Sequence, residues 1–100
     1  MTKTTFNETK AKHMERLEQF VPIVERVHGK HHPEFFKVHI LFNQLNQKLK
    51  DTKNEDTVLN EEFRQLREVT NHYEIPNDVC ESYAAVYTML EDLDRAYGEQ

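Results

Sequence analysis

Apolar residues recur every three or four positions along most of this chain, a spacing that places them on one face of an α-helix. Four such stripes predict four amphipathic helices. The inward positions predicted for the first two are Met14, Leu17, Val21, Val24 and His28, and then Phe35, Val38, Leu41, Phe42, Leu45 and Leu49. Those predicted for the last two are Leu59, Phe63, Leu66, Thr70 and Tyr73, and then Val79, Tyr83, Val86, Leu90, Leu93 and Tyr97, with Cys80, Tyr87 and Met89 at the edges.

The ends of the first helix are predicted from residues that cap helices. Thr5 and Glu8 have the spacing of a capping box, so we expect the helix to begin at Thr5. Gly29 is expected to close it in the left-handed conformation that glycine often adopts after a helix. Pro22 lies inside this stretch without an amide donor, which predicts a bend or a local break.

The other boundaries follow from proline and from polar runs. Pro33 is predicted to be the first residue of the second helix, with Glu34 near the positive end of the helix dipole. The polar residues 51–54 are expected to form a turn or a frayed helix end. We expect the third helix to run from about residue 55 to residue 73, and the segment 74–77 to separate it from the fourth.

The predicted fold is all-α: an up-down antiparallel four-helix bundle formed by one domain over residues 1–100. Short connections between consecutive helices favour antiparallel neighbours around one core. Composition agrees, because 31% of the residues are charged while the chain has only 2 Gly and 3 Pro. Long helices with solvated faces fit these values better than a turn-rich β fold.

Charge and hydropathy exclude several classes of function. The formal net charge is −5 and no basic stripe is present, so we expect no nucleic-acid binding. No apolar run approaches the roughly 20 residues that cross a bilayer, and the polar start lacks the centre of a secretory signal. A cytoplasmic protein is therefore expected. Cys80 is the only cysteine, so we expect no disulfide and interpret it as a small buried apolar residue.

The chain has 6 histidines, and four of them, His28, His31, His32 and His39, raise the question of a metal site. Glu25 and His28 also form the Glu-x-x-His motif of di-iron bundles, which need a second such motif and further Glu ligands. No second motif occurs. We therefore favour structural roles, with His28 packing at the end of the first helix and His31 and His32 in a polar connection, and predict no metal-ligating residue.

Catalytic motifs are also missing. The chain has no Gly-rich phosphate loop, no His-Glu-x-x-His and no Gly-x-Ser-x-Gly, so no catalytic or cofactor-binding residue is predicted, and a non-enzyme is favoured. The tyrosines could form a stacking platform or a redox path, but their positions favour core packing with hydroxyls at the rim. The charged residues Glu61, Glu62, Arg64 and Arg67 are interpreted as a solvated helix face.

Two segments have residue patterns more specific than those of an amphipathic helix. Residues 24–34, VERVHGKHHPE, resemble the junction between the first two helices of the hemerythrin-like domain in RIC-type iron–sulfur cluster repair proteins. Residues 66–80, LREVTNHYEIPNDVC, are similar to the junction between that domain's third and fourth helices, which also has Thr-Asn, Pro and Cys at this spacing. With Tyr83, Tyr87, Leu90 and Leu93, the resemblance extends over about residues 17–97.

This resemblance implies a bundle in which His and Glu side chains from all four helices hold two irons, and a role after oxidative or nitrosative damage. The chain departs from the ligand pattern. The first-helix ligand falls near Asn7, well before His13, and the second-helix His-x-x-x-Glu falls on residues 51–55, where Asp51 replaces the histidine. The last-helix histidine falls near Gln100. The segment with the third-helix histidine is missing, and the resemblance implies a structural role for His28.

The sequence supports two hypotheses. The first is a hemerythrin-like protein of the iron–sulfur repair type in a stress-response context, without a complete di-iron site and without a cofactor. Asp51 and Glu55 could then keep a weak site for a hard cation, one helical turn apart. The second is a non-catalytic helical module that acts through a protein partner or through self-association as a homodimer.

Overall fold

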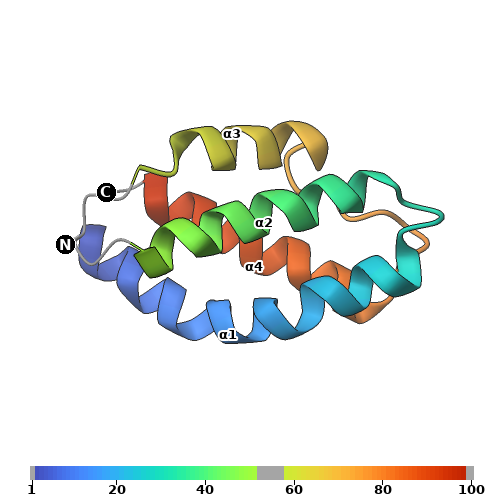
Figure 1. The fold of residues 1–100 in the computed structure, drawn as a ribbon, viewed down its shortest axis with the longest axis horizontal. Coiled ribbons are helices and arrows are strands. Elements are labelled where there is room, and N and C mark those ends of the chain that lie inside the picture. The colour runs from blue at the N-terminus through green and yellow to red at the C-terminus, as the bar shows by residue number, and fades with distance from the viewer. Residues whose placement is uncertain (1, 52–57, 99–100) are drawn as a thin grey trace.

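The computed structural model describes residues 2–51 and 58–98, with side chains from Phe6 onward. It contains four helices: α1 (Thr2–His28), α2 (Glu34–Asp51), α3 (Asn60–Val69) and α4 (Glu81–Gly98). Consecutive helices run in opposite directions, with α1 packed against α4 and α2 packed against α3 (Figure 1). The described residues contain no strand, so the prediction of an all-α, up-down bundle is confirmed.

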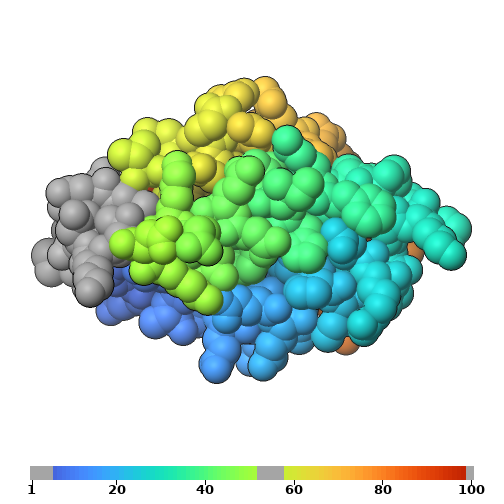
Figure 2. All heavy atoms as spheres, viewed as in Figure 1, coloured from blue at the N-terminus to red at the C-terminus, as the bar shows by residue number. Residues whose placement is uncertain are grey.

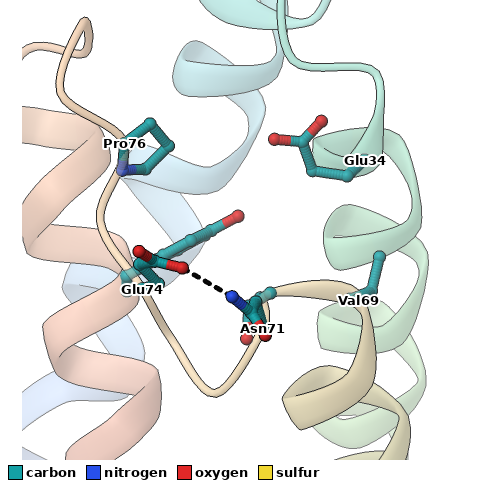
Figure 3. Close-up of a pocket in the computed structure, with 7 residues that line it drawn as sticks. Glu34, Val69, Asn71, Glu74 and Pro76 are labelled. Atoms are coloured by element: carbon teal, nitrogen blue, oxygen red, sulfur yellow. Dashed lines mark hydrogen bonds between the residues drawn. The ribbon is translucent and has the colours of Figure 1, made fainter.

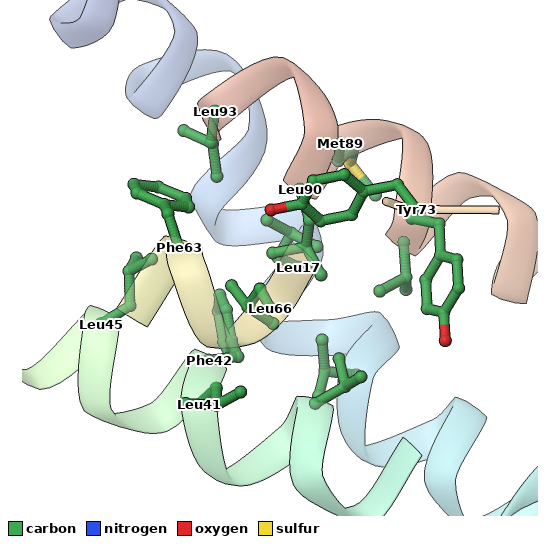
Figure 4. Packing of buried hydrophobic residues seen from close by; sticks show 14 of the residues in the cluster. Leu17, Leu41, Phe42, Leu45, Phe63, Leu66, Tyr73, Met89, Leu90 and Leu93 are labelled. Atoms are coloured by element: carbon green, nitrogen blue, oxygen red, sulfur yellow. The ribbon is translucent and has the colours of Figure 1, made fainter. Parts of the chain in front are cut away.

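The core of the bundle is apolar and is formed mainly by the predicted stripes. Leu17 of α1, Phe42 of α2, Leu66 of α3 and Leu90 of α4 point toward one another and are at most 2% exposed (Figure 4). Burial of such a side chain contributes about 1.5–3 kcal/mol. Packing across all four helices therefore accounts for the stability of helices that would be marginal alone.

The start of α1 differs from the prediction. The helix begins at Thr2 instead of Thr5, so the expected capping box lies inside it. The ring of Phe6 is 5% exposed and packs edge-on against the ring of Tyr97, with 5.7 Å between centroids. Contact with α4 thus holds the first turns of α1 in place, and this tertiary contact outweighs the local capping signal.

Pro22 does not break α1, which continues through it to His28. The predicted local break is therefore wrong, whereas Figure 1 shows a curved helix, in keeping with a bend. Val21 and Val24 beside Pro22 are buried in the core. Their packing holds the helix together where the proline removes one backbone hydrogen bond.

Gly29 follows α1, but its backbone conformation differs from the prediction. No glycine among the described residues has a positive φ, so Gly29 is not a left-handed cap. A Cβ atom at this position would lie 2.5 Å from the carbonyl oxygen of Glu25 and 2.8 Å from Cζ of Phe36. Glycine is needed here because the last turn of α1 itself and the first turn of α2 both crowd this position. Pro33 precedes α2 by one residue, since the helix begins at Glu34.

The third helix is shorter than predicted. It ends at Val69 instead of Tyr73, while the predicted start at residue 55 lies outside the described residues. Asn71, His72 and Tyr73 all have left-handed backbone conformations, with φ of 53°, 60° and 65°. The Thr70 hydroxyl stabilises this turn, because Oγ1 donates to the carbonyl of Leu66 at 2.6 Å and accepts from the amide of Tyr73 at 2.8 Å.

Among the described residues, no helix combines the length and the apolar character needed to cross a membrane.

Candidate functional site

Polar side chains gather where the α1–α2 connection meets the loop between α3 and α4. We define the junction cluster as His28, His32, Glu34, Asp78 and Cys80. The first three lie at the end of α1 and the start of α2, while Asp78 and Cys80 come from residues just before α4. Two segments that are about 50 residues apart in sequence are thereby joined by side-chain hydrogen bonds.

His32 is the centre of this cluster. Its Nε2 lies 3.0 Å from Oδ1 of Asp78, and its Nδ1 lies 3.1 Å from Oε2 of Glu34. Burial lowers the pKa of His32, but the hydrogen bonds to Glu34 and Asp78 and their negative charges outweigh it, so the pKa is raised above 6.5. A protonated imidazole donates from both nitrogens, which is what two carboxylate partners require.

Cys80 lies at the surface, so the prediction that it is buried is wrong. Its Sγ lies 3.2 Å from Nε2 of His28 at the end of α1. The cysteine precedes α4, and its carbonyl accepts a hydrogen bond from the amide of Ala84. The thiol thus lies at the surface where α1 ends and α4 begins.

Two tyrosines lie beneath the cluster. The ring of Tyr83 is 5.4 Å from the rings of both His28 and His32. Its hydroxyl lies 3.0 Å from that of Tyr87 and donates to Oε2 of Glu34 over 3.4 Å. Burial, followed by the hydrogen bond between them, raises the pKa of Tyr83, and burial raises that of Tyr87. Core packing is confirmed, but these hydroxyls are buried instead of lying at the rim.

Of the four histidines considered for a metal site, only His28 and His32 are brought together, with 6.4 Å between their ring centroids. His31 is exposed, and Nδ1 of His39 pairs with Oε2 of Glu25 at 2.9 Å. Glu25 therefore points toward α2, while His28 points toward Cys80, which separates the two residues of the Glu-x-x-His motif. Among the described residues, no three His, Cys, Asp or Glu side chains are grouped so that they could hold a metal ion.

The residues at which the resemblance to hemerythrin-like domains would place iron ligands lie outside this cluster. Asn7 is exposed, and His13 joins α1 to α4 through a 3.1 Å contact between its Nε2 and Oδ2 of Asp92. Asp51 is the exposed last residue of α2. Glu55, its predicted partner in a weak cation site, and Gln100 lie outside the described residues.

Two buried carboxylates were not expected from the sequence. Asp94 accepts hydrogen bonds from Arg67 at 2.7 Å and 2.8 Å and from the hydroxyl of Tyr73 at 2.7 Å. Glu62 is 7% exposed and pairs with Nζ of Lys48 at 2.8 Å. The predicted solvated face is therefore correct only in part, because Glu62 and Arg67 point toward other helices while Arg64 pairs with exposed glutamates on α3.

A cavity of about 320 Å³ lies beside the junction cluster. Figure 3 shows Glu34 reaching toward it from α2, with Glu74, Asn71 and Pro76 on the α3–α4 loop. Its walls are formed by Glu34, Val69, Thr70, Asn71, Glu74, Pro76 and Tyr87. The loop and its left-handed turn therefore shape a concave surface. Sequence reasoning missed this cavity and the role of Asp78, because nothing in the local pattern indicates how the loop folds back.

Comparison with known proteins gave no relative: no family model, no curated protein and no solved structure matches this chain significantly.

Proposed function

We propose that this chain is a non-catalytic helical module, related to the hemerythrin-like domains of iron–sulfur cluster repair proteins but without their di-iron chemistry. One observation carries the proposal: the space between the four helices is filled by apolar side chains (Figure 4). Di-iron bundles instead direct Glu and His side chains into that space. All six histidines of this chain lie outside its buried core.

The buried carboxylates do not supply a replacement for those ligands. Asp94 is occupied by Arg67 and Tyr73, and Glu62 is paired with Lys48. Neither carboxylate is grouped with the further His, Asp or Glu side chains that a metal ion would need among the described residues. The contacts of Glu62 and Asp94 thus support roles in helix packing.

Anaerobic loading with ferrous iron tests the loss of di-iron chemistry. We expect well under one iron per chain to remain after removal of unbound metal, because the described residues assemble no set of three ligands. Retention of two irons per chain would overturn the proposal and would restore the repair activity of the family as the leading hypothesis.

A module without chemistry must act through contact, and we infer that a second copy of the chain or a protein partner supplies it. Phe36 and Ile40 lie one helical turn apart on α2 and are 47% and 51% exposed. Figure 2 shows α2 across the front of the molecule between α1 and α3, so the outer side of this helix is open. A cytoplasmic location belongs to the same proposal.

Sedimentation velocity tests self-association. We expect a dimer at micromolar concentration that dissociates in the double variant Phe36→Ser/Ile40→Ser, since apolar contact area is lost. A wild-type chain that stays monomeric would exclude the homodimer, and binding to a different protein would then be the form of the proposal that stands.

A further inference from the structure

The cavity between the start of α2 and the α3–α4 loop has the properties of a small binding site. Its volume is about 320 Å³, which is at the lower end of the range for small-molecule sites. Three elements contribute to it: Glu34 comes from α2, Val69 from the end of α3, and Tyr87 from α4. The loop residues Asn71 and Glu74 line a further side, and the cavity is open to solvent (Figure 3).

The polar atoms of this lining that lack a partner are mainly hydrogen-bond acceptors. Glu34 engages His32 and Tyr83 through Oε2, and Glu74 engages the amide of Asn71 through Oε1. The second carboxylate oxygens of Glu34 and Glu74, and the side-chain carbonyl of Asn71, have no hydrogen-bond partner among the described residues. A ligand that only donates hydrogen bonds is therefore matched to this lining.

The hydroxyl donors on the cavity wall are already engaged. The hydroxyl of Thr70 donates to the carbonyl of Leu66, and the hydroxyl of Tyr87 is paired with that of Tyr83. No Lys or Arg is among the lining residues. An anion would thus meet two carboxylates, with the second N–H of the Asn71 side chain as its one unengaged side-chain donor. A cation is attracted by both carboxylates, although the His32 imidazolium beside Glu34 offsets part of that attraction.

The rest of the wall is apolar, with Val69, Pro76 and the ring of Tyr87. A bare metal ion fits poorly, because the described residues contain no group of three ligands for one. An alkylammonium ion has the required features: a head that donates three hydrogen bonds and a short apolar stem that packs on Val69 and Pro76.

We propose that this cavity binds a primary alkylammonium group, with Glu34 and Glu74 as its charged partners and Val69, Pro76 and Tyr87 around its stem. The group could belong to a free amine or to a lysine side chain of another protein. A free amine and a lysine side chain present the same ammonium group to the cavity, and two different probes distinguish them.

The test is an NMR titration of the isotopically labelled full chain with n-butylammonium chloride, with n-butanol as the uncharged probe of similar shape. We expect saturable shifts of the backbone amides of Val69, Asn71 and Glu74, and affinity for the cation at least about fivefold higher than for the alcohol. Equal affinity for both probes, or no saturable shift at these amides, would overturn the proposal. This comparison needs only the wild-type chain.

Matched variants then test the two carboxylates. Glu34→Gln and Glu74→Gln keep an oxygen acceptor for their present partners, and each should weaken n-butylammonium binding about two- to fivefold. Glu15→Gln, an exposed residue of α1 outside the cavity, makes the same change in net charge and should leave the affinity unchanged. Equal weakening in all three variants would mean that net charge alone attracts the probe, which would contradict a built site.

A second probe, Nα-acetyl-lysine amide, distinguishes the two sources of the ammonium group. If it binds at the same amides, the cavity accepts a lysine side chain. If only n-butylammonium binds, the ligand is a free amine.

Discussion

The two connections that meet at one end of the bundle reverse the chain by different physical means. Residues 29–33 join α1 to α2 with backbone hydrogen bonds, in which the amides of His31 and His32 donate to the carbonyl of His28. Close contact at Gly29 leaves no room for a side chain. This connection is therefore determined by steric fit.

The α3–α4 connection relies on side-chain hydrogen bonds. Left-handed backbone at Asn71, His72 and Tyr73 costs on the order of 1–2 kcal/mol for each residue. The Thr70 hydroxyl offsets part of that cost, as does the bond from the Tyr73 hydroxyl to Asp94. Burial, and then this bond, raises the pKa of Tyr73, so its hydroxyl stays protonated as a donor. The comparison teaches that one connection is sensitive to added volume and the other to lost polar groups.

The largest effect is expected at Gly29. Gly29→Val should lower the free energy of unfolding by about 3 kcal/mol, because the added atoms overlap the carbonyl of Glu25 and the ring of Phe36. Urea unfolding followed by circular dichroism measures this change. Gly98→Val is the matched control and should have little effect, since a Cβ there meets nothing within 4 Å. Equal effects at the two glycines would rule out steric fit as the basis of the first connection.

The next effect is expected at Thr70. Thr70→Val keeps the shape of the side chain but leaves the amide of Tyr73 without its partner, which should cost about 2 kcal/mol. Thr88→Val on the exposed side of α4 should stay within about 0.5 kcal/mol. A Thr70→Val chain as stable as the wild type would show that the left-handed turn does not depend on the hydroxyl.

The contact between the two connections should depend on pH through His32. Its folded-state pKa is raised above 6.5, so its contribution to stability is fully present below about pH 6.5 and is lost as the pH rises through the folded-state value. The difference in free energy of unfolding between the wild type and His32→Gln should therefore be larger at about pH 5 than at about pH 9, by at most about 1 kcal/mol. A difference that is independent of pH would mean that the imidazolium form makes no special contribution.

The smallest effect is expected at His31, because its contact in the connection is a backbone hydrogen bond that alanine keeps, while its side chain is exposed. His31→Ala should change the free energy of unfolding by less than about 0.5 kcal/mol, with or without divalent metal in the buffer. A sharp fall in melting temperature that occurs only in the presence of metal would instead identify the histidines as ligands.

The sequence predicted the helix interiors better than the connections. Periodicity places Leu17, Phe42, Leu66 and Leu90 in the core because burial of a helix face is repeated over several turns. The left-handed run after Thr70 has no such repeat, since it depends on the single hydroxyl of Thr70 and on Asp94, which lies 21 residues beyond Tyr73.

The candidate site was predicted less completely than the fold. The sequence singled out His28 and His32, but gave no sign that Asp78 and Cys80 would fold back against them. The exposure of Cys80 was missed for the same reason. A free cysteine is usually buried, whereas the path of the loop places this one at the surface. Contacts between segments so distant in sequence depend on the whole fold.

Metal analysis of the chain, isolated from cells without an affinity tag, tests the central claim most directly. An apolar interior and histidines spread over separate contacts predict no stoichiometric iron, zinc or manganese in the isolated protein. About two irons per chain would contradict the claim and would require metal ligands that the described residues do not provide.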